Sequence, residues 1–205
     1  MTAIIDYGVG NIFSLCSSLE YIGEKAVLTS DEKEIEHAER IILPGVGAFG
    51  DAAEKLKNSG LWNAVISSAD KKPLLGICLG MQLLLKKSTE FGEHEGLGLI
   101  DGVVLPIAEK IPAGLKIPHI GWNALYFPKD RKKSPIFEDI SEGEHAYFVH
   151  SYYAAGCGDA EIAYTEYKAK LTAAVGNGEN VFGVQFHPEK SGETGLKILR
   201  SFCKI

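Results

Sequence analysis

The sequence predicts an α/β fold, in which a central, mostly parallel sheet carries helices on both faces and antiparallel strands are added in the C-terminal half. Short apolar runs alternate with helix-like segments over residues 2–86. From residue 103 onward, strand-like runs follow one another and glycine, proline and aromatic residues become denser. Strict alternation of strand and helix is typical of a parallel sheet covered on both faces. The length of 205 residues fits one domain, spanning 1–205.

The first half divides into predicted strands over 2–6, 26–28, 40–43 and 74–77. Between and after them, the predicted helices cover 11–22, 31–38, 51–57, 61–69 and 79–86. We expect Ser30 to cap the second helix, because a serine followed by acidic residues is typical of a helix start. Asn58-Ser59-Gly60 separates the third helix from the fourth.

The second half contains predicted strands over 103–105, 123–127, 146–152, 162–167, 171–175 and 181–185, and a final helix over 193–202. The link between the last two strands contains Asn177-Gly178, which is a strong signal for a hairpin turn. These strands are therefore expected to extend the parallel sheet in antiparallel fashion.

Composition argues against several classes of protein. The formal net charge is −6 and no basic stripe is present, so we expect no nucleic-acid partner. The apolar runs are far shorter than a membrane span, and Met1–Asp6 lacks the basic segment of a signal peptide, so we expect no membrane association. Four cysteines without a Cys-x-x-Cys pair favour free thiols in a reducing cytoplasm. The histidines other than His187 lack metal-ligand spacing, and we expect neither a metal ion nor another cofactor.

Cys78 is the candidate nucleophile. It stands in Gly76-Ile77-Cys78-Leu79-Gly80, between a predicted strand and a predicted helix, and this is the thiol form of the nucleophile elbow. The helix N-terminus there favours the thiolate form of the side chain. The alternative is that Cys78 is a small buried apolar residue, which is the commoner fate of a single cysteine.

A base and its orienting group are expected in His187-Pro188-Glu189. His187 lies just after a predicted strand, and Glu189 follows two residues later; in an extended segment both side chains would point the same way, so that Glu189 can fix the imidazole. The carboxyl ends of parallel strands gather at one edge of a sheet, which allows His187 to meet Cys78. A purely structural histidine is the alternative. His150 is left open between lining the site and packing.

Two stretches can donate hydrogen bonds to an oxyanion. The N–H of Leu79 follows the nucleophile, and the loop containing Val46 and Gly47 follows a neighbouring strand. The same loop, Gly45–Gly50, matches the G-x-G-x-x-G pattern of dinucleotide-binding proteins. We reject that interpretation, because the match follows the third predicted strand rather than the first.

The elbow together with His-Pro-Glu resembles the class I (triad) glutamine amidotransferases. Four further stretches are most similar to the glutaminase subunits of imidazole glycerol phosphate synthases, and the resemblance runs over essentially the whole chain. These stretches are Asp6-Tyr7-Gly8-Val9-Gly10-Asn11, Leu43-Pro44-Gly45-Val46-Gly47-Ala48-Phe49, Pro118-His119-Ile120-Gly121-Trp122-Asn123 and Tyr147-Phe148-Val149-His150-Ser151-Tyr152.

The resemblance implies that glutamine is the substrate and that Cys78 forms a glutamyl thioester and releases ammonia. It implies that Gln82 and Glu90 hold the amino-acid end of glutamine. Gly47, Ser151 and Tyr152 match positions that contact the substrate in the family.

The resemblance also implies a partner: a cyclase subunit of the (β/α)8-barrel type, which forms a heterodimer and receives the ammonia for histidine biosynthesis. Asn11, Trp122 and Lys190 match interface positions. The alternatives are core packing for Trp122 and a solvated surface charge for Lys190. The family also implies low glutaminase activity until the partner binds its own ligand, and a peptide flip in Pro44-Gly45-Val46-Gly47 is a way to withdraw an oxyanion donor.

Two other functions are left open. One is a different triad amidotransferase, serving anthranilate, guanylate or pyridoxal phosphate synthesis, which the stretch Pro118–Asn123 argues against. The other is a non-catalytic scaffold with the same fold, which would have no need of Cys78, His187 and Glu189 together.

Overall fold

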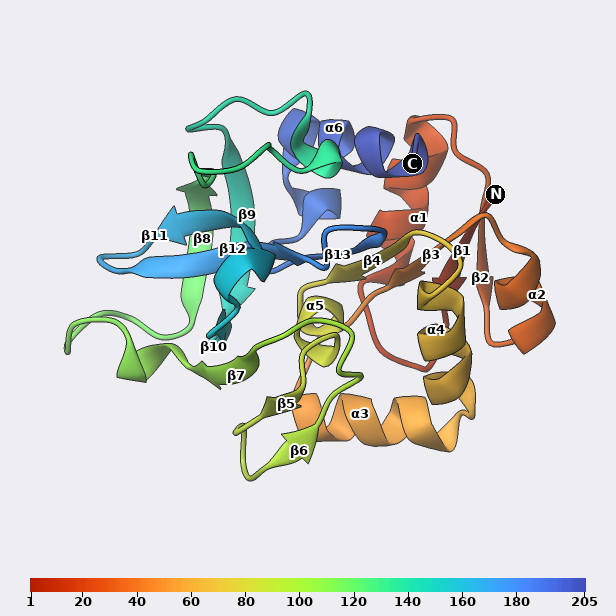
Figure 1. Cartoon of the computed structure of the whole chain (residues 1–205), viewed down its shortest axis with the longest axis horizontal. Coiled ribbons are helices and arrows are strands. Elements are labelled where there is room, and N and C mark those ends of the chain that lie inside the picture. Colours follow the sequence, from red (N-terminus) through yellow and green to blue (C-terminus); the bar gives the residue numbers. More distant parts are fainter.

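The computed structural model describes all residues 1–205 and is built around a seven-stranded sheet with the order β11-β12-β13-β4-β3-β1-β2 (Figure 1). The strands from β2 to β13 in this order are parallel, and β12 and β11 are antiparallel additions. The expected fold class is therefore confirmed. The strand bounds are β1 Thr2–Ile5, β2 Ala26–Thr29, β3 Arg40–Leu43, β4 Leu74–Ile77, β11 Glu161–Glu166, β12 Lys170–Gly176 and β13 Val181–Val184.

Helices cover both faces of this sheet. The strands place successive residues on opposite faces, so Ala3 and Ile5 of β1 join one apolar cluster while Ile4 joins the other. The first cluster packs under α2, α3, α4 and α5, and the second under α1 and α6. The helix bounds are α1 Ile12–Tyr21, α2 Glu32–His37, α3 Phe49–Asn58, α4 Leu61–Ala69, α5 Leu79–Leu83 and α6 Gly192–Cys203. None of these helices combines the length and apolar character that crossing a membrane requires.

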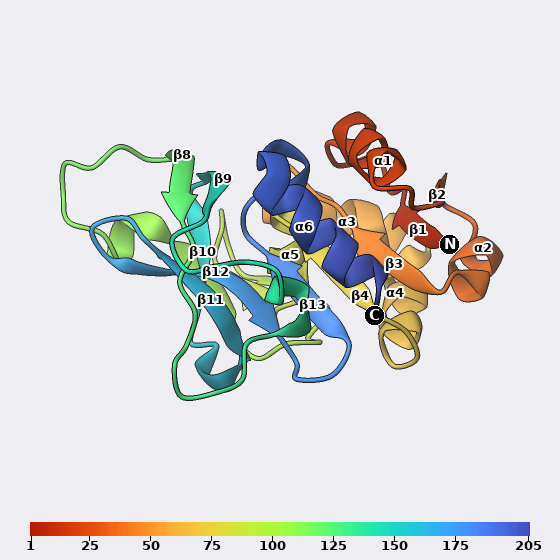
Figure 2. The same ribbon diagram turned by 90° about the horizontal axis from the view of Figure 1, so that it is seen from above.

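Two smaller sheets complete the fold: one reaches from β12 to α3 (Figure 1), and the other lies at the β11 side of the molecule, away from α1 and α2 (Figure 2). The first has the order β10-β7-β5-β6, and the second is the antiparallel pair β8–β9. Their bounds are β5 Lys87–Ser88, β6 His94–Glu95, β7 Val103–Pro106, β8 His119–Ala124, β9 His145–His150 and β10 Tyr152–Ala155. Four 3₁₀ helices complete the chain: η1 Ile107–Glu109, η2 Pro135–Phe137, η3 Gly158–Ala160 and η4 Pro188–Lys190.

Several predicted boundaries differ from the structure. Asp31, not Ser30, caps α2, because its carboxylate accepts the Lys33 N–H at 2.8 Å. The strand expected over 123–127 begins at His119 and ends at Ala124, since its pairing with β9 covers those residues; beyond it only Tyr126 bridges to β11. Strands β5 and β6 were not predicted, because two residues are too few to show a period. The hairpin at Asn177-Gly178 is confirmed by the antiparallel pairing of β12 and β13.

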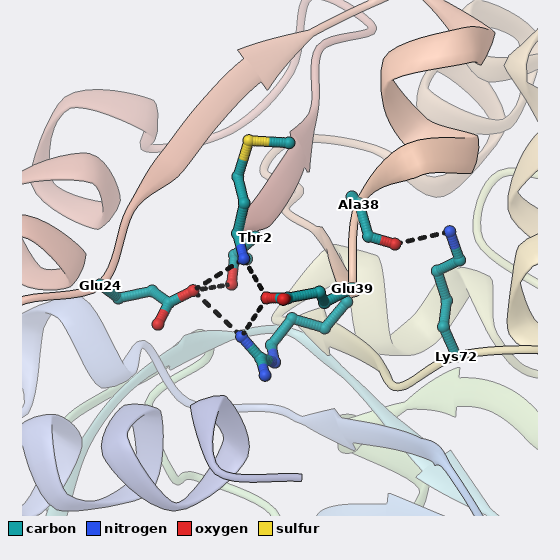
Figure 3. Close-up of polar contacts among 7 residues, drawn as sticks. Thr2, Glu24, Ala38, Glu39 and Lys72 are labelled. Atoms are coloured by element: carbon teal, nitrogen blue, oxygen red, sulfur yellow. Dashed lines mark hydrogen bonds and ion pairs between the residues drawn. The ribbon is translucent and has the colours of Figure 1, made fainter.

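The amino ends of the parallel strands are tied together by charged groups (Figure 3). Glu24, which precedes β2, accepts from Thr2 of β1 at 2.8 Å and from Arg40 of β3 at 3.1 Å. Lys72, which precedes β4, donates to main-chain carbonyls at the end of α2, among them that of Ala38 at 2.7 Å. These contacts hold the edge of the sheet opposite to the carboxyl ends of the strands.

Candidate active site

Three neighbouring strands deliver the candidate chemistry to one edge of the sheet. In the strand order β4 lies between β3 and β13. Cys78 follows β4, His187 lies just beyond β13, and the loop Pro44–Gly47 follows β3. Because all three strands run parallel, these residues come together at the carboxyl ends of the strands, as the sequence predicts.

The turn at Cys78 has the conformation of a nucleophile elbow. Cys78 adopts φ 55° and ψ −110°, and few residues other than glycine tolerate a positive φ. Its N–H donates to the Val184 carbonyl of β13 at 2.8 Å, which fastens the turn. The strain is therefore on the cysteine itself. Gly80 serves a different need, because a Cβ on it would lie 1.9 Å from the Leu43 carbonyl oxygen.

His187 and Glu189 are paired as expected, but not through an extended segment: Pro188–Lys190 form the 3₁₀ helix η4, and the turn of that helix brings Glu189 back to the imidazole. The imidazole Nδ1 lies 2.8 Å from Oε1 of Glu189, and both side chains are almost fully buried. Asn11 donates its side-chain N–H to the same carboxylate oxygen at 3.1 Å. Nε2 of His187 has no hydrogen bond and is left for proton transfer with a group in the cavity. Burial acts to lower the pKa of His187, but interactions with Cys78 and then Glu189 outweigh it and raise the pKa to about 10.

A cavity of about 290 Å³ opens over Cys78 and His187. Glu189 lies behind the imidazole and does not line it. Every residue that the sequence analysis assigned to the oxyanion or to the substrate does line it. These residues are Val46, Gly47, Leu79, Gln82, Glu90, Ser151 and Tyr152, and Pro118, Val149 and His150 complete the wall.

Glu90 supplies a carboxylate to this wall. Its Oε2 accepts the Phe49 N–H at 2.6 Å, at the start of α3, and its own N–H bonds Oγ of Ser88 at 3.1 Å. A carboxylate at a helix N-terminus is stabilised by the exposed N–H groups there. Burial, and after it the charge of Glu90, raises the pKa of Tyr152. The arrangement gives the cavity one fixed negative charge suited to an ammonium group.

The predicted oxyanion donors are not both free in this structure. The Leu79 N–H is bonded to the Gly45 carbonyl at 3.3 Å, a long hydrogen bond. The hydroxyl of Tyr7 donates to the neighbouring Pro44 carbonyl at 2.7 Å and holds the loop from beneath. Gly47 adopts φ 99°, and Val46 is exposed. The Leu79 N–H is therefore already engaged by the main chain of this loop.

Gln185 is a further residue of the site that no sequence motif indicated. Gln82 donates to its Oε1 at 3.0 Å and to the Tyr152 carbonyl at 3.2 Å, and Gln185 in turn donates to the sulfur of Cys78 at 3.9 Å. A usable signal existed, because Gln185 lies two residues before His187 in the same short segment that follows β13.

His150 is both buried and part of the cavity wall, which resolves the open alternative. Its Nε2 lies 3.0 Å from Nδ1 of His119, and its own Nδ1 bonds the Tyr152 carbonyl at 2.9 Å. Burial lowers the pKa of His119 to about 4 and that of His150 to about 3. Both imidazoles are therefore neutral at physiological pH.

The three predicted interface residues divide into two groups. Trp122 is 55% exposed and packs edge-on against Tyr147, so it is not a core residue. Lys190 is exposed, and its amine lies 6.0 Å from the centre of the same Tyr147 ring. Asn11 is half-buried and contacts Glu189. The structure thus joins Asn11 to the triad and leaves Trp122 and Lys190 on the surface beside it.

No group of three or more histidine, cysteine, aspartate or glutamate side chains is arranged to hold a metal ion.

Comparison with known proteins agrees with this site. The model of the family "Glutamine amidotransferase class-I" matches residues 3–205. The imidazole glycerol phosphate synthase subunit HisH of Caldanaerobacter subterraneus subsp. tengcongensis is 50% identical over all of this chain and 98% of its own length. The subunit of the same name from Methanothermobacter thermautotrophicus is 47% identical, again over all of this chain and 98% of its own length.

Solved structures support the fold alone. A crystal structure of a glutamine amidotransferase superimposes with a TM-score of 0.75 at 18% identity, covering 98% of this chain and 97% of that one. The structure of PurLQS from Thermotoga maritima gives a TM-score of 0.74 at 22% identity, covering 99% of this chain and 97% of that one. Taken with the matches in sequence, they lead to one conclusion: the chain belongs to the class-I glutamine amidotransferases and, within them, to the family of the HisH subunits.

Proposed function

We propose that this protein is the glutaminase subunit of an imidazole glycerol phosphate synthase. It hydrolyses glutamine to glutamate and ammonia, and the ammonia is used by a cyclase subunit that makes imidazole glycerol phosphate and aminoimidazole carboxamide ribonucleotide in histidine biosynthesis. The observation that carries the proposal is the cavity that Cys78 and His187 share with every predicted substrate residue. The likeness to HisH subunits over the full chain supports the same subunit role.

The proposed reaction begins when the Cys78 thiolate attacks the side-chain amide carbon of glutamine. A C–S bond forms, and the C–N bond breaks as Nε2 of His187 protonates the departing nitrogen, giving a glutamyl thioester and ammonia. His187 then takes a proton from water, which attacks the thioester; a C–O bond forms and the C–S bond breaks. Glu189 holds the imidazole in the required tautomer through the 2.8 Å contact to Nδ1.

The remaining walls of the cavity would orient glutamine. Glu90 is placed to receive the α-ammonium group, and Gln82, Ser151 and Tyr152 surround the amino-acid end. The N–H groups of Leu79 and of the Val46–Gly47 segment would stabilise the oxyanion once the loop has moved. One such donor typically contributes about 3 kcal/mol to the transition state.

The bond between the Leu79 N–H and the Gly45 carbonyl supports a resting state of low activity. In our proposal the partner and its ligand shift the Pro44–Gly47 loop, which frees Leu79. Amide hydrogen exchange in this loop should then change when the ligand-bound partner is added, and unchanged exchange would contradict the mechanism.

The proposed partner is a cyclase of the (β/α)8-barrel type, in a heterodimer in the cytoplasm. Ammonia that escapes into water near pH 7 becomes ammonium and loses its nucleophilic lone pair, so a dry passage between the subunits protects it. Trp122 and Lys190 lie exposed close to the triad, and they support a docking face on this side.

The direct test is Cys78→Ala in the complex with its cyclase subunit. We predict that glutamine-dependent synthesis falls to background, while synthesis from added ammonium salts stays near the wild-type rate, because the cyclase is untouched. Product formation with each nitrogen source measures both. A matched control is Cys157→Ala, which removes a buried thiol outside this cavity and should leave glutamine use intact. Persisting glutamine use by the Cys78 variant would refute the nucleophile assignment.

A further inference from the structure

We propose that Gln185 is a positioning residue of the glutaminase site, which fixes the amide of Gln82 toward the cavity and donates an N–H to the sulfur of Cys78. The inference rests on the proposed function and deepens it. Gln185 is fully buried and touches no solvent, so its side-chain amide can act only through its neighbours.

The backbone holds Gln185 in a fixed place beside the nucleophile. Its N–H donates to the Ala173 carbonyl of β12 at 2.8 Å. The residue before it, Val184, accepts the Cys78 N–H at 2.8 Å. The segment after β13 that carries Gln185 and the elbow that carries Cys78 are thus bonded to each other through Val184, which fixes the spacing of their main chains.

One main-chain group, the Tyr152 carbonyl, determines which atoms donate and which accept in this series of hydrogen bonds. The Tyr152 carbonyl can only accept, so the Gln82 atom 3.2 Å away is its side-chain nitrogen. The second N–H of that nitrogen points at Gln185, 3.0 Å away, which must present its oxygen. The other end of the Gln185 amide is then the nitrogen, 3.9 Å from the Cys78 sulfur. Reversing either amide would set two donors or two acceptors face to face.

The Tyr152 carbonyl also accepts a hydrogen bond from His150 of the β8–β9 sheet. Asn123 donates to the Glu166 carbonyl at 2.9 Å and contacts Nε2 of His119 at 3.3 Å. His119 therefore carries its proton on Nδ1 and donates to Nε2 of His150, which donates in turn from Nδ1 to Tyr152. The position of the Tyr152 carbonyl, and through it that of Gln82, is set by neutral groups throughout.

Two chemical effects follow for the reaction. Both N–H groups of the Gln82 side chain donate to protein atoms. Its carbonyl oxygen is therefore left to accept a hydrogen bond from an ammonium group in the cavity. The Gln185 N–H stabilises negative charge on the sulfur without titrating, because an amide stays neutral at every working pH.

Alkylation of Cys78 tests the sulfur contact on the full chain without any turnover. The rate of iodoacetamide labelling is measured against pH for the wild type and for Gln185→Met, which keeps the length and loses both polar atoms. We expect the midpoint of the rate profile to move to higher pH by about one unit, as the loss of a hydrogen bond to a charged group implies. Thr165→Val is the matched control, since it removes one buried hydrogen bond, to Ala124, away from the sulfur, and should not move the midpoint.

Protection by glutamine tests the contact to Gln82. The glutamine concentration that halves the labelling rate should rise about tenfold in Gln185→Met. Gln185→Glu keeps an oxygen that accepts from Gln82, so it should restore protection while its labelling midpoint stays high. Gln82→Met should lose protection and keep the wild-type midpoint.

The outcomes separate the two proposals. If folded Gln185→Met, checked by circular dichroism, keeps both the wild-type midpoint and wild-type protection, the role of Gln185 is refuted. If Gln185→Glu protects as poorly as Gln185→Met, the contact to Gln82 is refuted. If the wild-type thiol is not protected by glutamine at all, even with the partner subunit bound, the proposed function itself fails.

Discussion

At the scale of single residues, the site depends on one strained cysteine and the small groups that surround it. Cys78 holds a positive φ, and Gly80 lets the chain pass within reach of the Leu43 carbonyl. Behind the cysteine, Glu189 is shared by His187 and Asn11, which both contact its Oε1. The carboxylate is thus held from two sides, and the imidazole it orients is left with one free nitrogen.

Glu189→Gln should lower kcat by roughly a hundredfold, and by less than His187→Ala does, because it disturbs the orientation and charge of the base without deleting it. Glu189 helps to raise the pKa of His187 to about 10, so the neutral amide should lower that pKa. The imidazolium is then lost sooner as pH rises, and the alkaline limb of the kcat profile moves to lower pH.

The measurement is glutaminase rate against pH with the partner subunit present. Glu144→Gln is the matched control, because it removes a carboxylate that pairs with Lys197 outside the cavity. An unchanged alkaline limb in Glu189→Gln would show that Glu189 does not act on the imidazole.

At the scale of elements, the β8–β9 sheet joins the surface to the site. It carries exposed Trp122 on β8 and the buried register pair His119 and His150, of which His150 lines the cavity. The hydrogen bond between these imidazoles requires at least one of them to be neutral, since two imidazolium ions have no acceptor. The β8–β9 sheet is therefore sensitive to acid at its buried pair of histidines.

Stability should fall in mild acid because of this pair. The pKa values of His119 and His150 in the folded state lie near 4 and 3, below that of an unfolded histidine. The unfolded chain therefore binds protons first: the contribution to stability is complete above about pH 6.5 and is lost as pH falls toward the folded values. Each histidine adds a slope of up to about 1.4 kcal/mol per pH unit over that window.

Urea unfolding between pH 7 and 5 checks this, with His119→Asn compared with the wild type. The variant should show a shallower loss of unfolding free energy on acidification. His145→Asn, which changes an exposed histidine of β9, should follow the wild type. Equal slopes for His119→Asn and the wild type would contradict the expectation.

At the scale of the whole molecule, the two edges of the central sheet have different roles. At the amino ends of the strands, Arg40 pairs with Glu24, and Lys72 donates separately to carbonyls at the end of α2. The opposite edge carries the elbow and the loop Pro44–Gly47, and exposed Trp122 of the β8–β9 sheet lies beside it. The partner is therefore expected at the carboxyl edge, where the site opens.

Trp122→Ala should weaken the complex with the cyclase subunit at least tenfold, because a large aromatic side chain at an interface centre commonly supplies roughly 2 kcal/mol or more. Isothermal titration calorimetry measures the affinity. Leu28→Ala, on edge strand β2, removes another exposed apolar side chain and should bind as the wild type does. Alkylation of Cys78 in the free Trp122 variant should be unchanged. Wild-type affinity for Trp122→Ala would place the interface elsewhere.

The sequence was sufficient for the parts of the fold that repeat a local pattern. The parallel strands and the helices between them were predicted because each is a run of apolar residues with a clear period, and the hairpin because Asn177-Gly178 admits few other turns. The short strands β5 and β6 and the early start of β8 were missed, since their pairing partners, not their own residues, define them. That residues 1–205 form a single domain stays a prediction.

By itself, the sequence determined the reactive residue types and their place at strand ends: Cys78 at an elbow, His187 two residues before Glu189. Only the tertiary structure decided which amide reaches the sulfur, that Asn11 supports Glu189, and that the Leu79 N–H is bonded to Gly45. The physical reason is strand order. Spacing along a chain fixes which way a side chain points, whereas contacts between loops far apart in sequence depend on which strands become neighbours in the sheet.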